Sequence, residues 1–316
     1  MDDAWVWQRL EVGSGDAAGR LDVWLASALG VSRGRVVRLL EQGRVLRDGR
    51  ACVGGMKGRA VETGEVFEVA MIGGDAEEDR PGAIDGGEAV LAEGAGWVVL
   101  DKRVGTPVHP LRGGETGTLV NTLVTRWPEV MEACGGRGVG EGGLRSGVVH
   151  RLDVPTSGCV VMATEQGAWE RLRGAFAEHR VEKRYRAVVR GRLVASGEGF
   201  EPVDLSLAVT QHRPARVGVV SADDPRGRRC RLGYRVIEPL GDATVIEVDL
   251  QTGFLHQVRA TFAHLGHPVL GDADYGGKDP RVGRLMLHAA RLVIDGVEAV
   301  SPLPSAFSEG LAALAS

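Results

Sequence analysis

The chain has 316 residues, a formal net charge of −4, 43% apolar residues and 25% charged residues, so it can bury packed cores and is not a disordered protein. Its length corresponds to about two domains. Its apolar runs are too short to cross a bilayer, and its acidic start lacks the regions of a signal peptide, so we expect a cytoplasmic protein with no membrane partner.

Residues 20–43 carry the patterns of two short helices. Apolar side chains recur at helical spacing in the first helix, and they are Leu21, Trp24, Leu25, Ala28 and Leu29. The second helix is predicted to begin after an N-cap at Ser32 and to end at Gly43. Its inward-facing residues are Val36, Leu39 and Leu40. Each helix therefore has one apolar face that a small core can bury.

A short β hairpin is predicted after the helices. Residues 44–47 and 51–53 flank Asp48 and Gly49, a turn pair that is common in two-residue hairpin loops. Another short strand is expected over residues 66–69. Together with the helices, these strands predict a small α/β module over residues 1–72.

Positive charge is concentrated in this module. Residues 20–59 contain nine basic and three acidic side chains, a net charge of +6, so the rest of the chain carries −10. Such a patch is typical of a surface that binds nucleic-acid phosphates. We predict that five arginines contact RNA, namely Arg33, Arg35, Arg38, Arg44 and Arg47. The alternative is an ordinary helical module with a solvated charged face.

The same residues give the module a family resemblance. It resembles the small RNA-binding module first seen in a small-subunit ribosomal protein. The matching residues are Arg20-Leu21-Asp22, Leu25, Ser32-Arg33, Gln42-Gly43, Val45 and Asp48-Gly49. The resemblance implies that residues 1–72 bind RNA.

A glycine-rich and acidic segment follows the module. Residues 73–88 have few apolar side chains to bury, and their like charges favour an extended chain. We predict that this segment is a flexible linker, which leads to a larger domain over residues 89–316.

A second glycine-rich segment interrupts the larger domain at residues 135–147. Gly138, Gly140 and Gly143 have the spacing of a dinucleotide-binding loop. However, no apolar strand precedes this spacing and no helix pattern follows it. We therefore interpret the segment as a surface insertion and expect no cofactor there.

Short strand patterns dominate the larger domain. They occur at residues 97–100, 158–163, 185–189, 232–237 and 244–250. Helices are predicted over residues 168–176 and from Val258 to Gly266. Many strands with few helices favour an α+β fold over a doubly wound parallel sheet.

The segment from His150 to Gly158 reads His-Arg-Leu-Asp-Val-Pro-Thr-Ser-Gly and leads directly into an apolar strand. An acid in such a loop can project into a cleft while the strand holds it in place. Asp153 is therefore a candidate catalytic residue. The alternative is that its side chain only caps the turn.

These residues, His150-Arg151-Leu152-Asp153-x-x-Thr156-Ser157-Gly158, resemble the signature of the RluA family of pseudouridine synthases. Further segments resemble the other family motifs, in the family's order. They are Asp101-Lys102-x-x-Gly105-x-x-Val108-His109-Pro110, Lys183-x-Tyr185-x-Ala187, Thr252-Gly253-x-x-His256-Gln257-x-Arg259 and Gly266-x-Pro268-x-x-Gly271-Asp272-x-x-Tyr275-Gly276. The resemblance implies an extended, largely antiparallel mixed sheet with flanking helices and a central cleft. It also implies isomerisation of uridine to pseudouridine in structured RNA.

The resemblance implies roles for three catalytic residues. Asp153 would be the nucleophile that lets uracil leave its ribose, rotate and rejoin through carbon. Arg259 would pair with this carboxylate, which a guanidinium can bind bidentately. Tyr185 would stack on the base and take the proton from carbon-5, which requires a perturbation because a phenol has an ordinary pKa of ~10.

The resemblance also implies a substrate-binding role for residues around these three. They are Lys102, His109, Arg151, Leu152, Thr156, His256, Gln257 and Leu287. We expect Lys102, Arg151 and Arg259 to make the cleft locally positive. Two positions depart from the family pattern, because Arg103 stands where proline is usual and Phe254 stands where arginine is usual. The second change removes a cation that could bind phosphate.

Other functions are compatible with parts of the sequence. A non-catalytic RNA-binding protein on a degenerate synthase scaffold is favoured by Phe254. A glycosidase would need a second carboxylate beside Asp153, and we expect none from the motif segments. A metal site could be imagined from a set of polar residues, but no ligand spacing such as HExxH is present. That set is His256, His264, His267, His288 and Asp272.

The cysteines support an intracellular protein without a metal ribbon. Cys52, Cys134, Cys159 and Cys230 are far apart, and no CxxC pair is present. We expect them to be small buried side chains. Together with these observations, the family resemblance implies a monomeric RNA pseudouridine synthase without metal or cofactor, which acts on ribosomal RNA ahead of transfer RNA.

Overall fold

The computed structural model describes residues 5–16, 19–31, 33–72, 81–111, 114–133, 144–194, 197 and 199–316. The chain splits into two compact units. One contains Met1–Gly87, Val108–Val149 and Met162–Glu170, and the other contains Glu88–Pro107, His150–Val161 and Arg171–Ser316.

The domain boundaries expected at residues 72 and 88 stay a prediction. Several residues used in the sequence analysis lie outside the described ranges. They are Ser32, Cys134, residues 73–80 of the expected linker and the glycine spacing at residues 138–143.

Residues 5–72 contain a four-stranded antiparallel sheet in the order β1-β4-β2-β3, together with short helices. The elements are β1 (Trp5–Glu11), α1 (Leu21–Leu29), α2 (Arg33–Glu41), β2 (Val45–Arg47), β3 (Arg50–Ala51), a 3₁₀ helix (Gly54–Gly58) and β4 (Val66–Ile72). Leu21, Leu25, Val36 and Leu39 bury the predicted helix faces against Phe67. The expected helices, hairpin and following strand are confirmed. Strand β1 was not predicted, and two of its apolar residues, Val6 and Trp7, are exposed.

Two helices of the first unit were not predicted, α3 (Leu119–Arg126) and α4 (Val130–Ala133). Helix α3 begins with a capping box, in which Thr118 Oγ1 accepts from the Asn121 amide and Asn121 Oδ1 accepts from the Thr118 amide. The Asn121 Nδ2 atom also donates to the Gly82 carbonyl at 2.7 Å. This buried asparagine therefore fixes both the helix start and the segment around Gly82.

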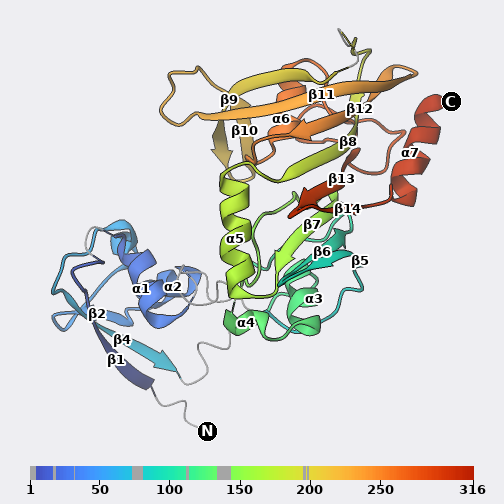
Figure 1. Cartoon of the computed structure of the whole chain (residues 1–316). Coiled ribbons are helices and arrows are strands. Elements are labelled where there is room, and N and C mark those ends of the chain that lie inside the picture. Colours follow the sequence, from blue (N-terminus) through green and yellow to red (C-terminus); the bar gives the residue numbers. More distant parts are fainter. Residues whose placement is uncertain are drawn as a thin grey trace. The chain divides into compact units, whose positions relative to one another are not determined.

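A ten-stranded mixed sheet forms the core of the second unit, with the strand order β10-β9-β11-β12-β8-β13-β7-β6-β5 and β14 paired to β13 (Figure 1). The strands are β5 (Val90–Gly94), β6 (Trp97–Lys102), β7 (Ser157–Ala163), β8 (Glu182–Arg190), β9 (Glu201–His212), β10 (Ala215–Val219), β11 (Arg228–Leu240), β12 (Ala243–Leu250), β13 (Leu287–Ile294) and β14 (Val297–Val300). Neighbours from β10 to β13 pair antiparallel, whereas β7 and β13 pair in parallel. The expected α+β fold with a largely antiparallel mixed sheet is confirmed.

Three further helices accompany the sheet: α5 (Gln166–Ala177), α6 (Gln257–His264) and α7 (Ser305–Ala315). The first two were predicted from their apolar spacing. None of the helices in the described ranges is long and apolar enough to span a membrane. Cys52, Cys159 and Cys230 are buried and free, as expected.

Gly158, the second residue of β7, lies where a side chain would not fit. Its φ of +114° belongs to a region that side chains rarely adopt. A Cβ there would lie 2.2 Å from the Ala289 carbonyl oxygen, because Gly158 and Ala289 face each other in the parallel ladder of β7 and β13. The absence of a side chain thus allows the strand that carries the preceding loop to reach its neighbour.

Candidate active site

Asp153 lies in a tight turn immediately before β7. The Thr156 amide donates to the Asp153 carbonyl at 3.0 Å, which closes the turn. The next carbonyl, that of Val154, accepts from Lys102 Nζ at 3.0 Å and from the Gly105 amide at 2.9 Å. The turn is therefore tied to the end of β6, while the Asp153 side chain keeps 19% of its surface exposed.

Arg259, on α6, lies at the centre of a cluster of carboxylates. Its Nη1 atom is 3.4 Å from Asp153 Oδ2, so the predicted pair is within salt-bridge distance. The bidentate partner, however, is Asp272, whose two oxygens accept from Nε at 2.7 Å and from Nη2 at 2.8 Å. Asp274 also accepts from Nη2 at 2.8 Å. The guanidinium is thus shared by three acids, and the expectation that Asp153 has no carboxylate near it is wrong.

Asp272 is the acid that holds Arg259 in place. Its side chain is fully buried, and Oδ1 also accepts from the backbone amides of Asp274 and Tyr275 at 3.1 and 3.2 Å. These bonds satisfy a charge that would otherwise be costly to bury. Sequence reasoning treated Asp272 only as a family position and as a possible metal ligand. Its location in the Gly271 to Gly276 motif was the signal that could have indicated this role.

His256 and Tyr275 complete the surroundings of Asp153. The His256 Nε2 atom lies 4.0 Å from Asp153 Oδ1, and its Nδ1 atom lies 3.0 Å from the Tyr275 hydroxyl. The Arg259 guanidinium lies over the Tyr275 ring, 5.0 Å from its centroid. The structure therefore brings together two predicted residues, His256 and Arg259, with one that the sequence analysis did not assign to the site, Tyr275.

Tyr185 and Leu287 share one face of the sheet. Leu287 of β13 is opposite Ala187 of β8, and Tyr185 is two residues before Ala187, so the three side chains point to the same side. Both Tyr185 and Leu287 are buried. Burial raises the pKa of the Tyr185 phenol above its ordinary value, and the negative charge of Asp153 raises it further.

The other predicted substrate-binding residues differ in their placement. Arg151 is exposed beside the turn and Leu152 is buried. Thr156 is buried, and its Oγ1 atom has no hydrogen-bond partner among the described residues. The Gln257 side chain is used in contacts within the protein. Its Oε1 atom accepts from Thr252 Oγ1 at 2.9 Å and from the Phe254 amide at 3.1 Å. Its Nε2 atom donates to the Arg231 carbonyl at 3.2 Å. His109 is buried in the first unit.

Lys102 supports the loop and does not line an open cleft. It is fully buried, and Nζ donates to the carbonyls of Arg103 and Val154, each at 3.0 Å. Burial lowers the pKa of Lys102 to about 7, against an opposing effect from Asp153. The expectation that Lys102 adds positive potential to an open cleft is therefore wrong.

The expected absence of a metal centre can be compared with the described side chains. Within the described ranges, no group of three or more His, Cys, Asp and Glu residues could hold a metal ion. Two of the histidines considered earlier have other partners: His288 Nδ1 lies 2.9 Å from Ser157 Oγ, and His267 Nδ1 lies 2.8 Å from the Arg190 carbonyl.

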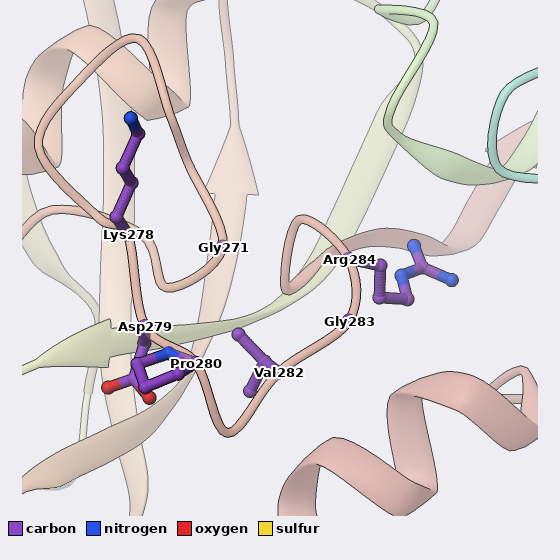
Figure 2. Close-up of a pocket in the computed structure, with 7 residues that line it drawn as sticks. All are labelled: Gly271, Lys278, Asp279, Pro280, Val282, Gly283 and Arg284. Carbon is purple, nitrogen blue, oxygen red and sulfur yellow. The ribbon is translucent and has the colours of Figure 1, made fainter.

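A pocket of about 440 Å³ lies next to the loop that follows Asp272 (Figure 2). Its lining residues are Gly271, Lys278, Asp279, Pro280, Val282, Gly283 and Arg284. Figure 2 shows the Lys278 and Arg284 side chains extending in different directions from this loop. The Arg284 guanidinium donates at 2.7 Å to Ser157 Oγ, and Ser157 is the residue directly after the Asp153 turn. None of the predicted catalytic residues lines this pocket.

Comparison with known proteins gives a consistent result. The family model described as RNA pseudouridylate synthase matches residues 96–264. An uncharacterized RNA pseudouridine synthase of Chloroflexus aurantiacus is 37% identical over 87% of this chain and 81% of its own. The ribosomal large subunit pseudouridine synthase D of Xanthomonas campestris is 34% identical over 83% of this chain and 72% of its own. The solved structure of human RNA pseudouridylate synthase domain containing 1 has a TM-score of 0.56 and 25% identity, and the match covers 73% of this chain and 90% of that chain.

The buried pair of Arg259 and Asp272 predicts a large loss of stability on substitution. Asp272→Asn leaves the buried guanidinium without its bidentate partner, and we expect the free energy of unfolding to fall by about 3–5 kcal/mol. Asp274→Asn is the matched control, because the Asp274 side chain is 52% exposed and its loss should cost at most about 1 kcal/mol. Denaturant unfolding of both variants measures the difference. Equal losses would contradict the assigned role of Asp272.

The buried Lys102 predicts a pH dependence of stability. Its pKa is about 7 in the folded protein and ~10.4 in an unfolded chain, so the unfolded state binds more protons between these values. The free energy of unfolding should therefore rise with pH in this window. In Lys102→Met the slope should fall by up to about 1.4 kcal/mol per pH unit. Urea unfolding at several values between pH 7 and pH 10 tests this, and identical slopes would refute it.

Proposed function

The chain belongs to the RNA pseudouridylate synthase family, and from this premise we propose that Asp153 is the residue with which it isomerises uridine in RNA. The protein is an RNA pseudouridine synthase, and its substrate is RNA. The observation that carries the assignment of Asp153 is its position. It is a partly exposed carboxylate on a fixed turn, 3.4 Å from a buried guanidinium.

The reaction breaks the bond between N1 of uracil and C1′ of the ribose and forms a bond between C5 and C1′. N1 gains a proton and C5 loses one, so no co-reactant is consumed. We assign to Asp153 the attack that lets the base detach, which requires an ionised carboxylate. Arg259 supports that state, because a guanidinium keeps its charge where a lysine could lose it. Asp272 and Asp274 occupy Nε and Nη2, so Nη1 remains for Asp153.

We assign to Tyr185 a packing role against the extruded base. Its ring and the Leu287 side chain share a face of the sheet. Together they form an apolar surface against which a flat pyrimidine can pack. Its raised pKa disfavours the phenolate in the free enzyme. Removal of the C5 proton by Tyr185 therefore requires that the bound, rotated base lower this pKa.

We propose large-subunit ribosomal RNA as the target, ahead of transfer RNA. Support comes from the relative in Xanthomonas campestris, which is named as a ribosomal large subunit enzyme. Phe254, which replaces an arginine of the family pattern, packs with Leu207, Val217 and Ala260. This position therefore holds a partly buried apolar ring, where the family pattern has a cation. A cytoplasmic location and a monomeric state stay predictions.

We propose that residues 1–72 bind RNA phosphates, as their resemblance to the ribosomal-protein module implies. Arg33 and Arg47, two of the arginines expected to contact RNA, pair with buried acids. Arg33 pairs with the buried Asp22 at 2.9 Å, and Arg47 pairs with the buried Glu65 at 2.7 Å. Their side chains remain 45% and 39% exposed, which leaves surface for a phosphate. The net charge of +6 over residues 20–59 supports the proposal.

The nucleophile assignment predicts that Asp153→Asn abolishes the reaction but not binding. The amide has nearly the same shape and no charge, so we expect tritium release from C5-labelled uridine in RNA to fall by at least about 10³-fold. RNA affinity should stay within about threefold, because the phosphate contacts are elsewhere. Asp223→Asn, an exposed acid between β10 and β11, is the control and should release tritium normally. Continued release by Asp153→Asn would refute the assignment.

A further inference from the structure

We propose that His256 donates a hydrogen bond to Asp153 from Nε2, and that Tyr275 fixes the ring tautomer that makes this possible. The proposal rests on the proposed role of Asp153. It starts from a chain of contacts that runs from β10 through Tyr275 to His256 and ends at the Asp153 carboxylate.

The first contact fixes the direction of the others. The Val217 amide of β10 lies 2.8 Å from the Tyr275 hydroxyl oxygen, and a backbone N–H can only donate. The phenol oxygen is therefore an acceptor in this contact. Its own proton is then available for His256 Nδ1, 3.0 Å away, and we assign this nitrogen as the acceptor. A neutral ring with Nδ1 as acceptor carries its single proton on Nε2.

The state of the ring supports this assignment. Burial and the charge of Arg259 lower the pKa of His256. The charges of Asp153, Asp272 and Asp274 raise it, but the net effect is a pKa below the ordinary value of histidine. The ring is therefore neutral at neutral pH. A charged ring would put a second N–H on Nδ1, which would face the phenol and leave the phenol proton without this acceptor.

The Nε2 proton then faces the carboxylate. His256 Nε2 is 4.0 Å from Asp153 Oδ1, while Arg259 Nη1 is 3.4 Å from Asp153 Oδ2, so a donor faces each oxygen. A shift of about 1 Å would bring the histidine into hydrogen-bond range, and catalytic hydrogen bonds are often long before substrate binds. Two donors on different oxygens restrict rotation of the carboxylate. His256 adds no full charge, so it would orient the nucleophile without pairing with it as a second cation.

The backbone places the ring for this task. His256 has φ 51° and ψ 22°, a left-handed conformation at the residue before α6 that is uncommon outside glycine. Its ring meets the Tyr275 ring edge to face, with centroids 5.7 Å apart and planes at 88°. Tyr275 is itself held by the Val217 amide and lies beside the Arg259 guanidinium. The imidazole is therefore held from both the backbone and its neighbour. His256 and Tyr275 are positioning residues that act through Asp153.

The tautomer is tested directly by ¹⁵N NMR of protein labelled at histidine nitrogens. The chain has eight histidines, so the signals of His256 are assigned by their loss in His256→Asn. At neutral pH we expect a protonated Nε2 and an unprotonated Nδ1 in the wild type. Tyr275→Phe removes the hydroxyl but keeps the ring, and should shift the ring toward a mixture of tautomers. An Nδ1–H tautomer or a charged ring in the wild type would overturn the proposal.

Kinetics test the consequence for Asp153. In His256→Gln the side-chain amide can place a donor near the position of Nε2, whereas in His256→Asn the shorter amide reaches only the position of Nδ1. We expect kcat to fall about 10- to 100-fold in His256→Asn with KM within about threefold, and the glutamine variant to recover most of this loss. Tyr275→Phe should lower kcat by about tenfold. Equal losses in the two histidine variants, or no loss in His256→Asn, would overturn the donor role.

The two measurements separate this proposal from the proposed function. The NMR result does not depend on activity, so it stands even if Asp153→Asn retains tritium release. In that case the tautomer would be correct and the nucleophile wrong. Thermal unfolding of each variant identifies any loss of fold, and only variants that unfold at the wild-type temperature enter the kinetic comparison.

Discussion

The structure depends on one cation that is shared by three acids. Arg259 is nearly fully buried, with 4% of its side chain exposed, and Asp272 is completely buried beside it. These two opposite charges are stable in the interior because the guanidinium donates to both oxygens of Asp272. The Asp274 backbone amide donates a further hydrogen bond to Asp272 Oδ1. With Asp272 and Asp274 on Nε and Nη2, only Nη1 faces Asp153. Nη1 therefore holds a carboxylate that keeps 19% of its surface exposed, which a substrate could reach.

The turn that carries Asp153 is held by polar contacts with neighbouring segments. Lys102 Nζ binds the Val154 carbonyl, and Ser157 Oγ accepts from Arg284 Nη2 at 2.7 Å and lies 2.9 Å from His288 Nδ1. Ser157, Arg284 and His288 are buried, so these contacts are not weakened by water. Gly158 then lets β7 pair closely with β13. The backbone that carries Asp153 is thus fixed by contacts with β6, β13 and Arg284.

Sequence patterns predicted most of the local elements, and the family resemblance implied that Asp153 pairs with Arg259. Helical spacing identified α1, α2, α5 and α6, because their inward faces are buried. The strand patterns of β9 and β10 were missed, although apolar residues alternate along β9 at Val203, Leu205, Leu207 and Val209. The partners of Arg259, in contrast, lay beyond local patterns. Asp153 is 106 positions away, and motif spacing gives no information on which of three carboxylates takes the bidentate geometry. Likewise, Gln257 was expected at the substrate, but its amide is used to close its own loop.

The most direct test of the central claim is the rate of one turnover by Arg259→Lys. A lysine keeps the charge and can pair with Asp272, but a single ammonium is not bidentate and cannot also hold Asp274 and face Asp153, so the unfolding temperature should fall. At a temperature where this variant is still folded, we expect the single-turnover rate on uridine-containing RNA to fall by at least about 100-fold, with RNA binding nearly unchanged. A wild-type rate in this variant would contradict the account, because the nucleophile would then not depend on the shared guanidinium.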